Sequence, residues 1–201
     1  MLEFTLEKEC TAKGYLHICG VDEAGRGPLC GPVVAAACIL PVDCEIEGLN
    51  DSKKLSEKKR EALFDIITEK ALSFSIAQST VEEINELNIL EATLLAMRRA
   101  IEGLDIPADF ALIDGNVCRD FTLDARAVIH GDAISPSIAA ASILAKVTRD
   151  RMCLDLDREY PEYGIAKNKG YGSKAHMDAL RKYGPAPIHR TKFIRFLDEE
   201  K

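Results

Sequence analysis

Apolar residues along the chain follow two patterns, short continuous runs and stripes at helical spacing. Runs at 15–22, 33–40, 73–80, 110–114 and 127–130 are typical of strands. The segment between the first two runs is rich in Gly and Pro and has the length of a hairpin loop, so we expect these two strands to be antiparallel neighbours. Because strand runs alternate with helical stripes, the pattern predicts one mixed α/β domain.

The helical stripes begin at residues that can cap a helix. Asn88 is followed three residues later by Glu91, as in a capping box, and Ser135 is followed by Pro136, which favours the first helical position. Four helices are expected, over about 56–70, 88–103, 135–160 and 173–183, with Ser56 and Ser173 capping the first and the last. The polar, glycine-containing residues between the last two helices are expected to form a connection.

The composition is that of an ordinary soluble globular protein. The 201 residues can bury a core, and 47% of them are hydrophobic. The longest apolar run, 33–40, is far shorter than the roughly 20 residues of a membrane-spanning helix, and the N-terminus lacks a signal-peptide pattern. We therefore expect a cytoplasmic monomer without membrane contact. The seven cysteines contain no C-x-x-C pair and are expected to be reduced and structural rather than zinc ligands.

The net charge of −7 argues against a polyanionic partner, but the charge is unevenly distributed along the chain. Residues 161–195 contain eight Lys or Arg and only two acids, a net charge of plus six. A second basic group lies at 53–60. A basic surface on an acidic body can bind nucleic acid, although a solvated face explains many such runs.

Four carboxylates stand where strands are expected to end. Asp22 and Glu23 follow the first run, Asp114 ends the fourth, and Asp132 lies two residues past the fifth. If these strands are neighbours, the carboxylates lie within a few ångströms of one another, where their repulsion favours bound cations. All-oxygen ligation suits Mg²⁺ or Mn²⁺, and two such ions about 4 Å apart can hold a phosphodiester for attack by water. The sequence thus indicates a phosphodiester hydrolase, although each Asp taken singly is also typical of a turn.

Next to the acidic pair, Gly25, Arg26 and Gly27 allow backbone groups to approach a sugar or a phosphate. The string at 22–28, Asp-Glu-Ala-Gly-Arg-Gly-Pro, resembles the opening motif of the type 2 ribonucleases H, the family of bacterial ribonuclease HII. Further strings follow in the order of that family: Asp51-Ser-Lys-Lys-Leu55, Asp114-Gly-Asn116, Gly131-Asp132, Ile138-Ala-Ala-Ala-Ser-Ile143, Ala145-Lys-Val147, Arg149-Asp150 and Lys169-Gly-Tyr-Gly172. The resemblance covers about residues 15–193.

The resemblance implies a ribonuclease H-like fold, in which helices flank a mixed five-stranded sheet. It implies a catalytic region at 1–160 and a helical, basic, substrate-binding region at 161–201, within one continuous domain. The implied activity is endonucleolytic cleavage of the RNA strand of RNA/DNA hybrids, and nicking on the 5′ side of single ribonucleotides in duplex DNA, with 5′-phosphate products. Two Mn²⁺ or Mg²⁺ ions would be bound by Asp22, Glu23, Asp114 and Asp132.

Roles for substrate contacts follow from the same resemblance. The backbone of Gly25, Arg26 and Gly27 would read the ribose 2′-hydroxyl, and Tyr171 would pack on the neighbouring deoxyribose. Phosphates would be contacted by Lys53, Lys54, Lys146, Lys169 and Arg190. His189 is expected to be a packed or surface histidine, because carboxylate–metal chemistry does not require it. The chain departs from the family pattern at Ser173, where threonine is usual, and at Thr191-Lys192, where an apolar residue and a serine are more frequent.

Two alternative functions stay open from the residues alone. A catalytically silent nucleic-acid-binding module would use the same basic surface and would bind hybrids without turnover. A different nuclease on the same sheet, such as a junction resolvase, would also need an acidic cluster but no reader of the 2′-hydroxyl. Cleavage of all-DNA branched substrates would favour that second alternative.

Overall fold

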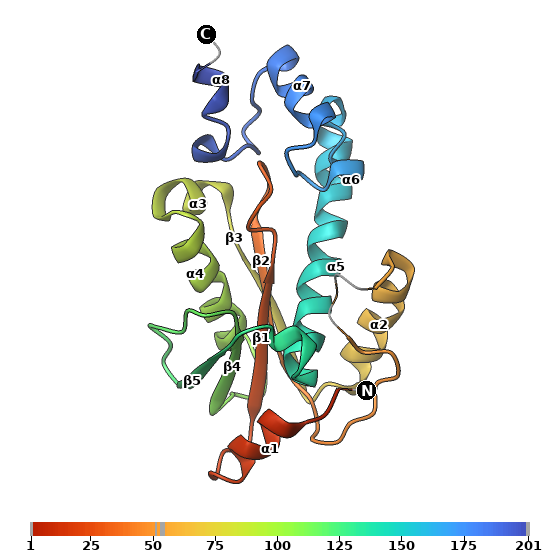
Figure 1. The fold of residues 1–201 in the computed structure, drawn as a ribbon, viewed down its shortest axis with the longest axis vertical. Coiled ribbons are helices and arrows are strands. Elements are labelled where there is room, and N and C mark those ends of the chain that lie inside the picture. Colours follow the sequence, from red (N-terminus) through yellow and green to blue (C-terminus); the bar gives the residue numbers. More distant parts are fainter. Residues whose placement is uncertain (1, 51, 53–54, 200–201) are drawn as a thin grey trace.

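A five-stranded sheet lies at the centre of the computed structural model, which describes residues 2–50, 52 and 55–199 (Figure 1). Its strands are β1 (Ile18–Ala24), β2 (Val33–Ile39), β3 (Ser73–Ser79), β4 (Phe110–Asp114) and β5 (Asp124–Val128), in the spatial order β3-β2-β1-β4-β5. The pairs β1–β2 and β2–β3 are antiparallel, whereas β1–β4 and β4–β5 are parallel. The mixed α/β sheet and the antiparallel hairpin are confirmed, and the fifth strand begins earlier than the sequence pattern predicts.

The helices are α1 (Thr5–Thr11), α2 (Glu57–Lys70), α3 (Val81–Leu87), α4 (Ile89–Glu102), α5 (Pro136–Glu159), α6 (Ile165–Asn168), α7 (Lys174–Tyr183) and α8 (Phe196–Glu199). Short 3₁₀ turns are η2 (Gly131–Ala133), η3 (Pro161–Tyr163) and η4 (Thr191–Phe193). The side chains of Ser56, Asn88, Ser135 and Ser173 all accept backbone hydrogen bonds as N-caps. The four predicted helices are therefore confirmed. The expected connection at 161–172 differs, because it contains η3 and α6.

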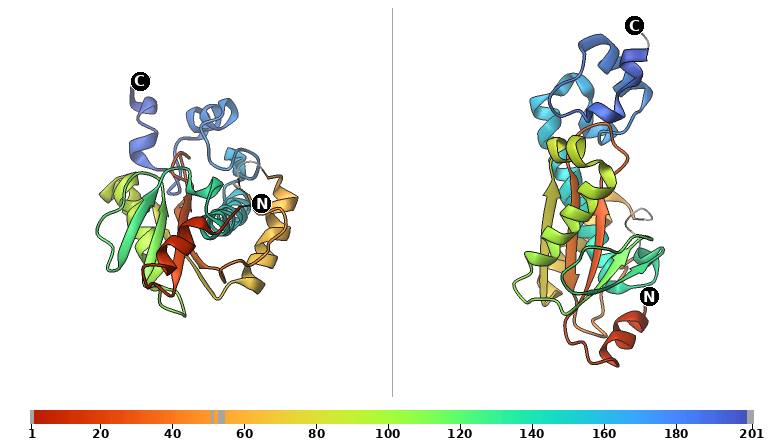
Figure 2. Two further views of the ribbon diagram at one scale, coloured as in Figure 1. Left: turned by 60° about the horizontal axis from the view of Figure 1, so that its bottom comes forward. Right: turned by 90° about the vertical axis from the view of Figure 1, so that its left-hand side faces the viewer.

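Two helical layers cover opposite faces of the sheet (Figures 1 and 2). α5 and α2 pack on one face, and α4 packs on the other against β2 and β3. Close contact between α5 and β1 requires small residues, since a methyl group at Gly20 would lie 2.1 Å from the carbonyl carbon of Ser137. Ala139, Ala140 and Ala141 in the same helix are fully buried. This tight packing fixes the side chains of α5 relative to the end of β1.

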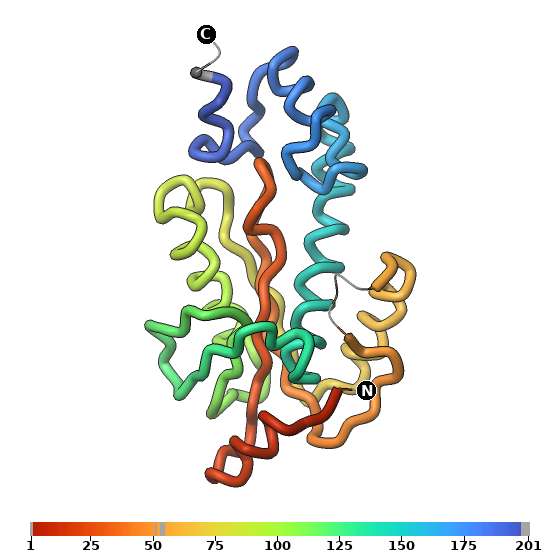
Figure 3. Tube along the Cα trace, viewed as in Figure 1, coloured from red at the N-terminus to blue at the C-terminus, as the bar shows by residue number. Residues whose placement is uncertain are grey.

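The C-terminal segments gather at one end of the molecule, opposite α1 (Figure 2). The loop that joins β1 and β2 reaches this end and lies against the C-terminal segments (Figure 3). Three backbone hydrogen bonds join them: Leu29 N–H donates to Gly170, Gly31 N–H donates to Ile188, and Arg190 N–H donates to Leu29. An apolar cluster that includes Cys30, Tyr163 and Leu180 fills the space between the loop and α7.

The cysteines form no disulfide, and five of the seven are buried. Burial raises the pKa of Cys19 to about 12 and that of Cys30 to about 11, so both thiols are protonated at neutral pH. Among the described residues, no helix combines the length and the apolar character needed to cross a bilayer.

Candidate active site

The end of β1 carries the first two carboxylates. Asp22 is 4% exposed, and its Oδ1 atom accepts a hydrogen bond of 2.7 Å from the backbone N–H of Glu23. The hydroxyl of Ser142, from α5, also hydrogen-bonds to Asp22. Glu23 accepts a 3.3 Å hydrogen bond from the guanidinium of Arg26. Successive strand residues point to opposite faces of a sheet, so the two carboxylates reach the end of β1 from different sides.

The sheet topology places Asp114 at the same edge as this pair, and Asp132 follows in the turn after β5. The parallel register pairs Val21 with Ile113, which places the following residues, Asp22 and Asp114, at the same edge of the sheet. The Asp114 carboxylate accepts a 2.7 Å hydrogen bond from the N–H of Gly131, which holds the turn η2 against β4. Asp132 is the next residue in that turn and is 5% exposed. The first, fourth and fifth strands are thus neighbours, as the prediction required.

The electrostatics of this edge favour a bound cation. Burial, followed by the charges of Glu23 and Asp114, raises the pKa of Asp22 well above its usual range. The ionised carboxylates repel one another in a partly desolvated place, and a divalent ion would relieve that repulsion. A donor set made only of carboxylate oxygens fits a hard ion such as Mg²⁺ or Mn²⁺. The residues present therefore fit the metal that the sequence predicted here.

Beside the carboxylates lies a hollow that is lined by residues from β1, the β1–β2 loop, the segment before α2, α5 and the segment before α7. The lining residues are Asp22, Glu23, Ala24, Gly25, Arg26, Gly27, Ser52, Ser142, Lys146, Arg149 and Tyr171. A second, shallower hollow on the α4 side shares Glu23 and Arg26 with the first and also contains Asp114. Glu23 and Arg26 therefore lie where the two hollows meet.

The glycine loop is shaped for close approach of a ligand. Gly25 has a φ of +98°, a left-handed conformation that favours glycine. A methyl group at Gly27 would lie 3.3 Å from Cε1 of Tyr171, so the loop backbone and this ring border the same space. Tyr171 is 50% exposed, which leaves its ring accessible to a ligand. The structure thus brings Gly25, Arg26, Gly27 and Tyr171 together, as the sequence predicts.

Arg190 does not lie where a phosphate contact would place it. Its side chain is fully buried, and its guanidinium donates to the carbonyl oxygens of Gly25 (2.7 Å), Arg26 (2.9 Å), Pro28 (2.8 Å) and Gly31 (2.8 Å), and also to Pro32. Residues that are distant in sequence supply these acceptors, which is why the buried position was not apparent from the chain. We therefore correct its role: Arg190 supports the glycine loop from behind.

Arg149 has a similar position and was assigned no role from the sequence. It is 2% exposed, and its guanidinium donates to the carbonyl of Lys169 over 3.0 Å and, over 3.4 Å, to those of Cys30 and Pro32. A methyl group at Gly25 would lie 2.0 Å from Nε of Arg149. A signal was available, because Ser142, Lys146 and Arg149 recur at helical spacing, four and three residues apart.

The remaining basic residues differ in their surroundings. Lys146 lines the first hollow, and its ammonium group donates a 2.6 Å hydrogen bond to Asp150, a buried carboxylate that also lies 3.7 Å from Arg60. Lys169 lies 3.9 Å from Glu57 and has a side chain that is 19% exposed. Lys53 and Lys54 lie outside the described residues, although Ser52 beside them contacts Ser142 over 2.9 Å.

Comparison with known proteins gives one consistent result. The family model of ribonuclease HII matches residues 19–196. A ribonuclease HII of Desulfitobacterium hafniense is 56% identical over 187 residues, which cover 93% of this chain and 72% of that protein. A ribonuclease HII of Burkholderia lata is 56% identical over 176 residues, covering 88% and 82%. The crystal structure of ribonuclease H2 from Pyrococcus horikoshii superimposes with a TM-score of 0.75 at 29% identity, covering 92% and 98% of the two chains.

Proposed function

The chain belongs to the ribonuclease HII family and is a metal-dependent endonuclease that acts on RNA/DNA hybrids, and from this premise we propose how its residues perform and restrict that reaction. The proposed activity includes nicking on the 5′ side of a single ribonucleotide in duplex DNA. One observation carries the proposal: Asp22 and Glu23 line the same hollow as the glycine loop and Tyr171, and Glu23 also lines the adjoining hollow that contains Asp114. All of these groups come from one chain, which supports activity as a monomer.

We assign Asp22, Glu23, Asp114 and Asp132 as ligands of two divalent ions, Mn²⁺ or Mg²⁺. When bound, such ions stabilise the charge on the attacking and the leaving oxygen of a phosphodiester. The raised pKa of Asp22 supports the assignment, because a buried carboxylate beside two others needs a compensating charge. The hydrogen bond from Gly131 to Asp114 orients that ligand and leaves its second oxygen for an ion.

The backbone of residues 25–27 is proposed to select the ribose. A 2′-hydroxyl is both a donor and an acceptor, and it is the group that distinguishes RNA from DNA. At Gly25 and Gly27 no side chain stands between the backbone and the hollow, so backbone amide groups can approach that hydroxyl. Arg190 and Arg149 fix the loop through its carbonyl oxygens, which keeps these backbone groups in place before substrate arrives.

Tyr171 is proposed to pack on the sugar next to the selected ribose. Its ring is half exposed and lies beside Gly27, so a sugar that follows the ribose along the strand meets the face of this ring. A flat apolar surface accepts a deoxyribose more readily than a hydroxyl-bearing ribose, because it offers the hydroxyl no partner. Lys146 and Lys169 are proposed to contact phosphates, a role in which they hold the strand without reading its sequence; we extend the same proposal to Lys53 and Lys54.

The test uses duplex DNA that contains one ribonucleotide, together with all-DNA duplex and an all-DNA branched junction. We expect a single nick on the 5′ side of the ribonucleotide with Mn²⁺ or Mg²⁺ and none with EDTA. Asp22→Asn should lower the rate by at least about 100-fold while hybrid binding persists, whereas the exposed Asp105→Asn should not change it. Binding of the hybrid without any metal-dependent nick would sink the proposal and favour a silent binding module.

A further inference from the structure

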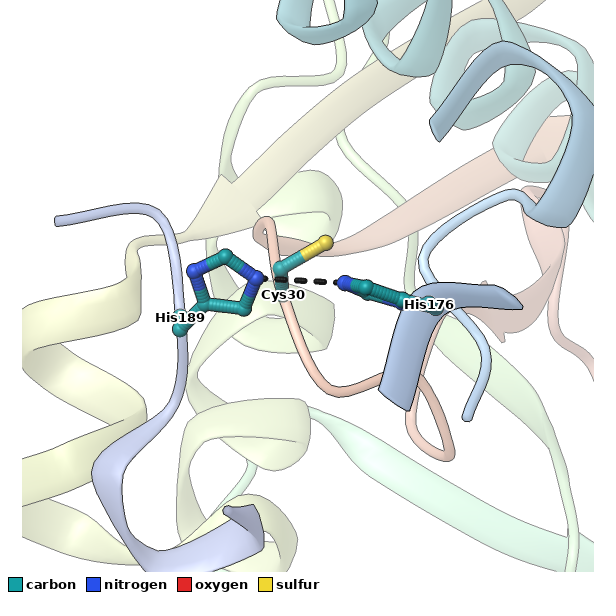
Figure 4. A group of neighbouring side chains, drawn as sticks. All are labelled: Cys30, His176 and His189. Carbon is teal, nitrogen blue, oxygen red and sulfur yellow. Dashed lines mark hydrogen bonds between the residues drawn. The ribbon is translucent and has the colours of Figure 1, made fainter. Parts of the chain in front are cut away.

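Cys30, His176 and His189 form a buried cluster (Figure 4), and none of them lines the two hollows beside the carboxylates. Their exposed fractions are 1%, 0% and 2%. The thiol sulfur and one nitrogen of each imidazole all lie within 4.8 Å of one another, and the two Nε2 atoms are 3.1 Å apart. The three residues come from three segments: the β1–β2 loop, α7 and the segment after α7. The sequence contains no C-x-x-C pair, but the fold brings one cysteine and two histidines together from distant segments.

His176 is oriented as a metal-binding histidine usually is, and His189 can become so by the shift of one proton. Nδ1 of His176 lies 3.0 Å from the carbonyl oxygen of Tyr171, so its proton is held there and Nε2 carries a lone pair. In the metal-free network Nε2 of His189 donates to Nε2 of His176, and Nδ1 of His189 accepts from the N–H of Ala186 over 3.0 Å. The carbonyl oxygen of Ala186 lies 3.2 Å from the same Nδ1, so it can accept the proton of His189 once Nε2 binds an ion. A backbone carbonyl thus accompanies each candidate nitrogen ligand.

We propose that Cys30, His176 and His189 bind a thiophilic transition-metal cation of the zinc class. Thiolate and imidazole are the ligands that Zn²⁺ selects, whereas Mg²⁺ and Mn²⁺ prefer the carboxylates. Binding requires that the thiol of Cys30 releases its proton to solvent as the sulfur–metal bond forms. It also requires that the proton of His189 moves from Nε2 to Nδ1, which breaks the hydrogen bond between the two Nε2 atoms and frees both for the ion. The two nitrogens already have nearly the separation of ligands on one tetrahedral ion at about 2.0 Å from each. The sulfur must approach by a small side-chain movement.

The ion would join segments that border the first hollow beside the carboxylates. Cys30 lies three residues after Gly27, His176 is bonded to Tyr171, and His189 precedes Arg190. Cys30 and His189 are also paired by a β-bridge, so the loop and the C-terminal segment are already in register. Tyr163, whose ring centroid is 4.6 Å from that of His189, belongs to the apolar shell around the cluster, and a water that enters with the ion would be its fourth ligand. The site is structural: it would hold the glycine loop and Tyr171 together without taking part in hydrolysis.

Co²⁺ is the probe, since a thiolate ligand gives it a charge-transfer band in the near ultraviolet that carboxylates cannot produce. The full chain is stripped with EDTA, unfolded and refolded anaerobically with Co²⁺, so that burial does not block entry, and with excess Mg²⁺ at the carboxylates. We expect one equivalent of Co²⁺ to give the band, Zn²⁺ to remove it, and Zn²⁺ to raise the Tm by several degrees.

Cys30→Ser and His176→Gln should lose both the band and the Zn²⁺-dependent shift in Tm, and circular dichroism reports whether each variant is folded. Cys118→Ser, which removes a half-buried thiol outside the cluster, is the matched control and should keep both. The proposal is overturned if the wild type shows no band, or if Cys30→Ser retains it. Hydrolysis of the hybrid with Mg²⁺ is measured separately, so failure here leaves the proposed nuclease function standing.

Discussion

The guanidinium of Arg190 donates a 2.7 Å hydrogen bond to the carbonyl oxygen of Gly25, the first glycine of the proposed ribose-reading loop. Its other donors bind the carbonyl oxygens of residues 26, 28, 31 and 32. Burial lowers the pKa of Arg190 to about 10, so the side chain stays charged at neutral pH. Arg190 thus holds the carbonyl oxygens of residues 25 and 26, and the ribose-reading role proposed for this loop falls to its N–H groups.

Arg190→Lys should destabilise the protein and weaken its selection of ribose. Lysine keeps the charge but cannot bind four or five carbonyls at once with its single ammonium group. We expect a loss of about 2–3 kcal/mol in the free energy of unfolding, measured by denaturant titration, and a fall in the ratio of ribonucleotide to deoxyribonucleotide cleavage. The exposed Arg195→Lys is the control. Equal stability of Arg190→Lys and wild type would show that the buried bonds contribute nothing.

Gly25→Ala and Gly27→Ala should separate stability from substrate selection. At Gly25 the methyl group would lie 2.0 Å from Arg149 and the residue has a positive φ, so we expect loss of both stability and activity. At Gly27 the methyl group meets only the half-exposed ring of Tyr171 at 3.3 Å, which can move, so the Tm should stay unchanged while kcat/KM falls about 10-fold or more.

Gly14→Ala is the matched control for these variants. Its φ is +101°, close to that of Gly25, but a methyl group there meets nothing within 4 Å. It should cost about 1 kcal/mol through backbone strain alone. If Gly25→Ala is no worse than Gly14→Ala in thermal unfolding, the contact with Arg149 is not what shapes the loop.

Asp22→Asn should stabilise the metal-free protein. Burial and the neighbouring charges raise the pKa of Asp22 on folding, so the folded state binds its proton more tightly than the unfolded state, and stability falls as the pH rises through this window. For a chain of this size, each 1 kcal/mol of stability changes the Tm by roughly 2–4 °C. In EDTA the variant should therefore melt higher than wild type at pH 8, with a smaller gain at pH 4. A variant that melts lower at pH 8 would contradict the repulsion described for this edge.

Lys146→Ala should weaken nucleic-acid binding uniformly. Its ammonium group lines the hollow and is oriented by Asp150 over 2.6 Å, so it is available for one phosphate contact. Loss of one contact should reduce the slope of log affinity against log salt by about 0.9. Affinities are measured in the Asp22→Asn background to prevent cleavage. Lys13→Ala, at the α1 end of the molecule, is the control, and an unchanged slope for Lys146→Ala would refute the assignment.

Glu83→Gln should destabilise the protein only above acidic pH. The bidentate ion pair with Arg99, and then the N-cap bond to Thr80, lower the pKa of Glu83 on folding. The stabilisation by the ionised Glu83 carboxylate is therefore fully present above the pKa of the unfolded state. It is lost as the pH falls through the lower pKa of the folded state. We expect a loss of about 0.5–1 kcal/mol at pH 7 that vanishes in strong acid, with the exposed Glu86→Gln as control. A loss that persists in acid would point to packing instead.

Local signals in the sequence predict most of the fold and the carboxylate edge. Caps such as Ser135 act on the next three residues, and strand-end acids such as Asp114 follow directly from the apolar runs, so both can be read without tertiary information. The helix α3 was missed although Thr80 and Glu83 form a capping box, because that helix is only seven residues long and follows a strand directly. The buried position of Arg190 could not be predicted, because its hydrogen-bond acceptors are carbonyl oxygens up to 165 residues away in the sequence.

Arg190 is synthesised long after the glycine loop that it supports. A ribosome delivers Asp22, Glu23, Asp114 and Asp132 well before it reaches residue 190, and folding during synthesis proceeds from the N-terminus. A nascent chain that has just passed Asp132 already carries the whole acidic set, but the proposed ribose-reading loop still lacks the support of Arg190. The proposed metal ligands are thus encoded early in the chain, and the support of the proposed selective loop is added only when the last helices emerge.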